Sequence, residues 1–229
     1  MSGGVDIHRY GDAQQLAVAL AQVLARQLRD AIAARAVASL VVSGGRTPLP
    51  LFGQLRREAL DWSRVFVTLA DERWVDAEDV ASNERLVREE LLRDAAVAAR
   101  FIPLKTPAES PAAGLREAWQ RLAQIPRPFD IVLLGMGDDG HTASLFPLSP
   151  GIDAAMDPAA QPGLVATTAP VAPTRRISMN LATLVQSRQH YLHFTGAAKW
   201  QLWQSSGAEL PVGLTLRRAV SRPQLYWSP

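Results

Sequence analysis

A histidine lies directly behind a glycine-rich loop in the stretch 135–141, which reads GMGDDGH. An imidazole titrates near physiological pH, so His141 could accept a proton from water and act as a general base. Either the neighbouring Asp139 or the more distant Asp71 could orient the ring or raise its basicity. The alternative is a structural histidine that caps a helix or is buried in the core.

A second loop that could bind a ligand is SGGRTP at 43–48, between a predicted strand and a predicted helix. Glycines let backbone N–H groups approach an anion closely, and the N-terminus of the helix adds partial positive charge. The loop could equally be a plain tight turn without a ligand. It is not a P-loop, because the Gly-Lys-Ser/Thr ending is missing.

The stretch 135–140 also matches the G-x-G-x-x-G pattern of dinucleotide-binding proteins. Three features argue against a dinucleotide oxidoreductase. Asp138 and Asp139 would place negative charge beside a pyrophosphate, and Pro147 and Pro150 would shorten any helix behind the loop. No clear strand ending in Asp or Glu follows about 20 residues later.

The sequence predicts no metal site. It has no cysteine, which excludes disulfides, thiolate metal sites and a cysteine nucleophile. His190 and His193 lie three residues apart in a predicted strand, where they would point to opposite faces of the sheet. We therefore assign a structural role to both of them, and to His8.

The charged residues favour a small anionic ligand over a nucleic acid. The formal net charge is +2, and the basic residues are mostly arginines, scattered without a basic tract. Arginine is suited to bidentate recognition of phosphate and carboxylate. Arg175, Arg176 and Lys199 stand near the starts of predicted elements, where each could also be a solvated surface residue.

The length and the hydropathy pattern favour a soluble protein. A chain of 229 residues is long enough to bury a sizeable core. No apolar run approaches the roughly 20 residues of a membrane span, and the N-terminal stretch lacks the layout of a signal peptide. We therefore expect a cytoplasmic protein without a membrane partner.

Strands alternate with helices along the chain. Helices are predicted at 12–34, 47–59, 82–93, 111–123 and 197–204. Strands are predicted at 37–42, 65–70, 101–104, 129–134, 177–179 and 189–194. A loop is predicted at 149–163, and one or two short strands are predicted after Leu214. This order predicts a single α/β domain over 1–229, with an open, mostly parallel sheet between two layers of helices. Ligands collect at the carboxyl ends of such strands. The polar clusters 43–45, 71–73 and 138–141 should therefore share one site.

Taken together, the motifs resemble the glucosamine-6-phosphate isomerase/6-phosphogluconolactonase family. The resembling pieces are SGGRTP at 43–48, DERWVD at 71–76 with Ser82-Asn83, LGMGDDGHTASLFP at 134–147, RRIS at 175–178 and TGAAK at 195–199. They span most of the chain in order, and the piece at 134–147 is the most specific. The lactonases of this family share the open α/β/α fold.

The resemblance implies hydrolysis of 6-phospho-glucono-1,5-lactone without a metal or cofactor. His141 would be the general base on water, and Asp71 would stand at the pocket wall or contact the histidine. The implied contacts to the phosphate and other substrate oxygens are Gly44, Gly45, Thr47, Arg73, Arg176 and Lys199. Arg46 replaces a small serine that is common in the family, so it adds a phosphate contact or points outward. The oligomeric state, monomer or homodimer, is left open.

Two rival functions share this fold. Glucosamine-6-phosphate deaminases carry a glutamate five residues after the histidine, where this chain has Phe146, and favour an aromatic residue in place of Arg73. Because phenylalanine cannot transfer protons, the deaminase mechanism would lack a group. Sugar-phosphate sensors with this fold usually carry an added DNA-binding segment, for which the chain leaves no room before its first strand and helix.

Overall fold

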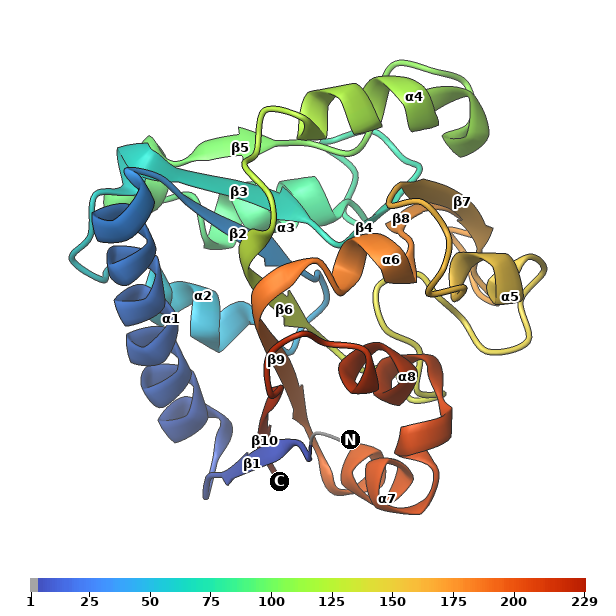
Figure 1. The fold of residues 1–229 in the computed structure, drawn as a ribbon. Helices are drawn as coiled ribbons and strands as arrows, with labels where there is room; N and C mark the ends of the chain where they lie inside the picture. Colours follow the sequence, from blue (N-terminus) through green and yellow to red (C-terminus); the bar gives the residue numbers. More distant parts are fainter. Residues whose placement is uncertain (1–3) are drawn as a thin grey trace.

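The computed structural model describes residues 4–229 and contains a seven-stranded sheet in which neighbouring strands pair in parallel (Figure 1). In their order across the sheet, the strands are β1 (Asp6–Arg9), β10 (Gln224–Ser228), β9 (Ser187–Thr195), β6 (Phe129–Leu134), β2 (Ala38–Val42), β3 (Val65–Leu69) and β5 (Arg100–Ile102). The helices are α1 (Ala13–Arg35), α2 (Leu49–Leu55), α3 (Asn83–Glu90), α4 (Pro111–Leu122), α5 (Ile152–Ala155), α6 (Leu181–Leu184), α7 (Ala197–Ser205) and α8 (Pro211–Arg217).

Helices cover both faces of the sheet. In Figure 1, α1 and α2 lie along one face, and α6 and α8 lie along the other. Every residue of the central strands β2, β3 and β6 is buried, as expected for parallel strands between two helical layers. This is the open three-layer α/β/α fold that the sequence predicts. No helix within residues 4–229 is long and apolar enough to cross a membrane.

A smaller antiparallel sheet lies beside the carboxyl end of β3. Its strands, in order, are β4 (Asp71–Arg73), β8 (Arg175–Met179) and β7 (Leu164–Thr168). Only Ala70 separates β3 from β4, so the chain passes from the large sheet into the small one almost at once. The small sheet therefore holds β4 and β8 at the edge where ligands bind in such folds.

Helix α1 forms where the leucine spacing predicts it. The carboxylate of its N-cap, Asp12, accepts a hydrogen bond from the backbone N–H of Gln15 at 2.8 Å, which satisfies a free donor of the first turn. Its apolar face is fully buried and consists mainly of Leu16, Leu20, Leu24 and Leu28. Burial of this face packs the helix against β2, β6 and β10.

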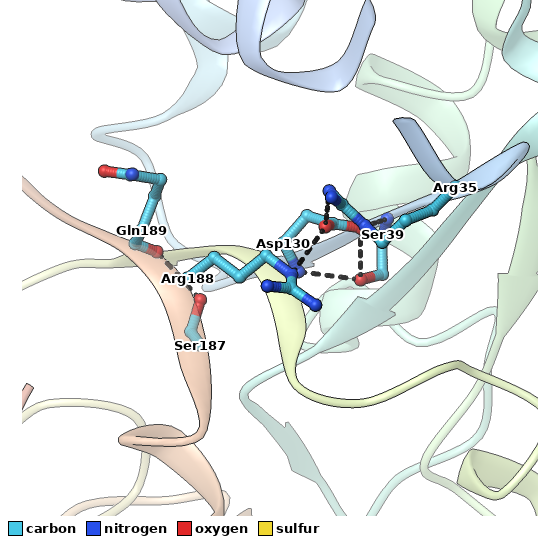
Figure 2. Close-up of polar contacts among 6 residues, drawn as sticks. All are labelled: Arg35, Ser39, Asp130, Ser187, Arg188 and Gln189. Atoms are coloured by element: carbon cyan, nitrogen blue, oxygen red, sulfur yellow. Dashed lines mark hydrogen bonds and ion pairs between the residues drawn. The ribbon is translucent and has the colours of Figure 1, made fainter. Parts of the chain in front are cut away.

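A buried carboxylate ties the other end of the sheet together (Figure 2). Asp130, near the start of β6, accepts hydrogen bonds from the backbone N–H of Ser39 at 2.9 Å and from its hydroxyl at 3.1 Å. The Arg35 guanidinium donates to the same carboxylate at 2.5 Å, and Arg188 Nε lies 3.5 Å away. The network joins β6, β2, β9 and the end of α1, so it fixes the strands whose opposite ends carry the polar loops.

Several elements differ from the sequence expectation. The predicted helix 47–59 begins at Leu49 and ends at Leu55. Beyond it, the backbone N–H groups of Arg57 and Glu58 donate to carbonyls three residues earlier, as in turns. The predicted loop 149–163 contains α5, and the region after Leu214 contains the end of α8 and one strand, β10. Strand β7 was not predicted from the sequence. Among the strands of residues 4–229 it pairs only with β8, and in this short, weakly apolar stretch only Leu164 and Thr167 are buried.

Candidate active site

A pocket of about 350 Å³ lies across the carboxyl ends of β9, β6, β2 and β3. Its walls include all but one of the residues that the sequence predicts for the site: Gly44, Gly45, Arg46, Thr47, Asp71, Arg73, His141, Arg176 and Lys199. The remaining residue, Asp139, contacts His141. The three polar clusters that were predicted to share one site are therefore brought together.

His141 and Asp139 form a close pair. The Nδ1 atom of His141 lies 2.5 Å from Oδ1 of Asp139, which also accepts the backbone N–H of His141 at 3.0 Å. Burial by itself raises the pKa of Asp139, but the hydrogen bonds from His141 outweigh it and the net pKa is lowered. A carboxylate at this distance holds the proton on Nδ1 and leaves the lone pair of Nε2 available to accept another. The Phe146 ring packs against the imidazole, with 4.4 Å between centroids.

Asp71, the other carboxylate that could orient the histidine, is engaged elsewhere. Its Oδ2 atom accepts a short hydrogen bond from the Ser144 hydroxyl, and its backbone carbonyl accepts one from the amide of Asn83 at 2.9 Å. The backbone N–H of Ser144 donates in turn to the hydroxyl of Ser178 on β8. Asp71 therefore links the segment after His141 to the small sheet and stands in the pocket wall.

Two arginines supply unpaired positive charge to the pocket. Arg73 on β4 lies opposite Arg176 on β8, and both Nε atoms are buried without a hydrogen-bond partner among the residues that the structure describes. Within residues 4–229, neither guanidinium has a carboxylate at ion-pair distance. Burial, together with the nearby charge of Arg73, lowers the pKa of Arg176. Buried charges are normally paired, so this arrangement favours an anionic ligand.

The sequence did not settle whether Arg175 or Arg176 faces the ligand, and the structure places them differently. Arg176 lines the pocket, whereas Arg175 is exposed and donates to the backbone carbonyl of Glu109 at 3.1 Å. Arg46 is also exposed, but it stands at the pocket rim. Lys199 donates to the carbonyl of Met136 at 2.7 Å, so its ammonium is held against the loop that carries His141.

Three pocket residues were not singled out from the sequence. The hydroxyl oxygen of Ser43 and the Oδ1 atom of Asn83 are buried and have no partner in the described part of the chain. His193, which was assigned a structural role, also lines the pocket. Both Ser43 and Asn83 stand inside motifs that carry the family resemblance. Their short polar side chains are common in turns and caps, so the sequence alone gave no reason to prefer a ligand contact.

Gly137 makes room for the His141–Asp139 pair. A Cβ atom at this position would overlap the Cε1 and Nδ1 atoms of His141 and lie 2.9 Å from Oδ1 of Asp139. We expect Gly137→Ala to displace the imidazole and to lower kcat by at least about 100-fold, because small misplacements of a catalytic group are costly. Steady-state kinetics on the folded variant measures this. Gly53→Ala, where a Cβ atom meets nothing within 4 Å, is the control; wild-type kcat in Gly137→Ala would contradict the expectation.

Among residues 4–229, no group of three or more His, Asp or Glu side chains is close enough to hold a metal ion. The chemistry that the pocket offers is that of a carboxylate-bound imidazole, two unpaired guanidiniums, and backbone N–H groups in glycine loops. Together with the fold, these features are those of an α/β protein whose pocket, at the carboxyl ends of parallel strands, is suited to a small anionic ligand.

The chain belongs to the glucosamine-6-phosphate isomerase/6-phosphogluconolactonase family, whose model matches residues 11–227. It is 43% identical to the 6-phosphogluconolactonase of Rhizobium meliloti, over 98% of this chain and 99% of that protein. It is 41% identical to the 6-phosphogluconolactonase of Pseudomonas aeruginosa, over 100% and 97%. A crystal structure of a 6-phosphogluconolactonase from Shewanella baltica superposes with a TM-score of 0.92 and 41% identity, covering all of both chains. The predictions of the family, the fold and the lactone-hydrolase class of enzyme are confirmed.

Proposed function

We propose that this enzyme hydrolyses 6-phospho-D-glucono-1,5-lactone to 6-phosphogluconate, with His141 as the general base. The observation that carries the proposal is the His141–Asp139 pair, with its 2.5 Å contact, in one pocket with two unpaired arginines. This combination suits a substrate that has both a reactive carbonyl carbon and a phosphate. The partner of the site is accordingly a small phosphorylated lactone.

In the proposed reaction, Nε2 of His141 takes a proton from water while the water oxygen attacks the lactone carbonyl carbon. Asp139 stabilises the imidazolium that forms. Backbone N–H groups of the glycine loops that line the pocket would stabilise the tetrahedral oxyanion. When the intermediate collapses, the bond from this carbon to the ring oxygen breaks and the imidazolium returns its proton to that oxygen. The product is the open-chain acid, and His141 is neutral again.

The phosphate would bind at the small-sheet end of the pocket. Arg73 and Arg176 lie opposite each other there, and both carry buried Nε atoms without partners. The loop 43–48 contributes Gly44, Gly45 and Thr47, with Arg46 at the rim. Lys199 stands on α7, which follows β9, and is a further cation for the other oxygens of the ligand. A dianionic phosphate would pair charges that the protein leaves unpaired, which is how such a ligand gains affinity.

We expect Arg176→Ala to raise KM for the lactone by about 10- to 100-fold, because it removes a charge-assisted contact in both the ground and transition states. Arg175→Ala is the matched control, since Arg175 is the adjacent arginine and is exposed. Its KM should stay at the wild-type value. The measurement is initial-rate kinetics on freshly made lactone, corrected for spontaneous hydrolysis.

The same assay tests the function itself. Wild-type turnover no faster than the spontaneous background would overturn the proposal. Release of ammonia from glucosamine 6-phosphate would instead support the deaminase alternative. That outcome is not expected, because the residue five positions after His141 is Phe146, whose ring packs on the imidazole and cannot carry protons.

A further inference from the structure

A second histidine borders the pocket at the end opposite the small sheet. His193 lies near the end of β9, and the register Leu134↔Leu192 places it beside Gly135. Its side chain is buried, with the residue only 4% exposed, and it lines the pocket together with Leu133, Leu134 and Met136. Gly135 carries no side chain, and a Cβ atom there would meet the backbone oxygen of His193 at 3.9 Å and no atom of the imidazole within 4 Å.

His193 differs from the other histidine of the same strand. His190 points to the opposite face. Its Nε2 atom lies 3.0 Å from the backbone carbonyl of Leu184, and its Nδ1 atom is buried without a partner among residues 4–229. The His193 ring has no hydrogen-bond partner within residues 4–229. A buried polar ring without partners is costly, so an imidazole left open to a pocket favours a ligand that supplies them.

The protonation state of His193 decides which ligand group suits it. Burial lowers the pKa of His193 to about 4, so the ring is neutral at physiological pH. A neutral imidazole offers one N–H donor and one acceptor nitrogen. A hydroxyl group can accept from the first or donate to the second, whereas a phosphate dianion offers only acceptors.

The charged side chains of the pocket also place the phosphate away from His193. The unpaired guanidiniums of Arg73 and Arg176 lie on the small sheet, next to β3. His193 is on β9, which β6 and β2 separate from β3 in the strand order. The ammonium of Lys199, also near the β9 end, is held by the Met136 carbonyl at 2.7 Å and lies 3.6 Å from Oδ1 of Asp138. The phosphate thus has its charged partners at one end, and the neutral imidazole is at the other.

We propose that His193 is a substrate-binding residue that hydrogen-bonds a hydroxyl group of the sugar, and so helps to select polyhydroxylated lactones. The assignment rests on the proposed function, because it takes the ligand to be a phosphorylated sugar lactone. It also gives the ligand one orientation in the pocket, with the phosphate at the small sheet and the hydroxyl-bearing carbons toward β9.

The kinetic test replaces the imidazole with an apolar side chain. His193→Leu should raise KM for the lactone by about tenfold, because one hydrogen bond contributes about a factor of ten to affinity. It should change kcat by less than about threefold. His193→Gln, which keeps a donor and an acceptor, should recover part of the loss. His190→Leu is the matched control on the same strand, and its KM should not change. An unchanged KM in a folded His193→Leu protein would overturn the assignment.

Nuclear magnetic resonance of the imidazole separates a binding role from a structural one. Adding 6-phosphogluconate to the wild-type protein should shift the His193 ring resonances, while inorganic phosphate should shift them little. An equal shift with inorganic phosphate, or no shift with 6-phosphogluconate, would overturn the hydroxyl assignment. Absence of both lactone turnover and 6-phosphogluconate binding would overturn the proposed function as well, so the two failures are distinguishable.

Discussion

Replacement of His141 with glutamine is expected to lower kcat for lactone hydrolysis by about 10²- to 10⁴-fold, the usual contribution of a general base. Glutamine is polar and of similar length, but it cannot take a proton from water. Because the imidazole acts on water and not on the phosphate, KM should change much less than kcat. His141 is partly exposed at the pocket, so the substitution should leave the fold intact.

The partner of His141 can be identified with two substitutions at adjacent positions. Asp139 contacts the imidazole at 2.5 Å, whereas the carboxylate of Asp138 is 93% exposed and 3.6 Å from Lys199. Asp139→Asn should lower kcat by about tenfold or more, since the neutral amide no longer stabilises the imidazolium. Asp138→Asn makes the same chemical change and should leave kcat within about twofold.

These variants also test which of the two candidate carboxylates, Asp139 or Asp71, orients His141. If Asp139→Asn keeps full kcat, Asp139 does not orient the base. In the structure Asp71 contacts Ser144 and not the imidazole. Loss of its carboxylate should therefore disturb the wall of the pocket and not the orientation of His141. Retention of wild-type kcat in the His141 variant would contradict the mechanism but not the reaction, which is measured separately from background hydrolysis.

The sequence was most informative where function depends on short contiguous motifs. The loop 43–48 and the loop 135–141 were both placed at strand ends from the apolar runs that precede them, and the structure brings them into one pocket. Motif order along the chain was enough for this, because parallel strands present their carboxyl ends at the same edge. The large sheet was therefore predictable from the alternation of strands and helices.

Contacts between distant segments were not predictable in this way. The small sheet pairs residues 71–73 with 176–178, about a hundred positions apart, through strands as short as three residues. Periodicity cannot identify so short a strand, and the register that sets Arg73 against Arg176 is a tertiary property. The same holds for His193. The sequence assigned it a structural role, but its place in the pocket wall depends on how β9 lies beside β6.

The positions of Arg73 and Asn83 depend on one buried carboxylate between them. Glu72 is 1% exposed, and its Oε1 atom accepts from the backbone N–H groups of Arg73 at 2.6 Å and Asn83 at 2.7 Å. Its Oε2 atom accepts from the N–H of Glu84 at 2.6 Å and from the hydroxyl of Ser82 at 3.2 Å. The side chain thus satisfies free donors at the start of α3 and joins that helix to β4.

Burial raises the pKa of the Glu72 carboxyl to about 7, against the lowering effect of the three backbone N–H groups. An acid whose pKa rises from 4.5 to this value on folding binds more protons in the folded state between the two values. This group should therefore make the protein less stable as the pH rises from 4.5 to about 7, with no further change above that range. Glutamine at this position cannot titrate, so it removes this contribution.

We expect Glu72→Ala to lower the free energy of unfolding by about 3–5 kcal/mol, because three buried N–H donors lose their acceptor. Glu72→Gln keeps an acceptor for two of them and should cost about 1–2 kcal/mol, with a smaller deficit at pH 8 than at pH 5. Urea unfolding at both pH values measures this, with the exposed Glu89→Ala of the same helix as the control. A Glu72→Ala deficit no larger than that of Glu72→Gln would show that α3 does not depend on this carboxylate.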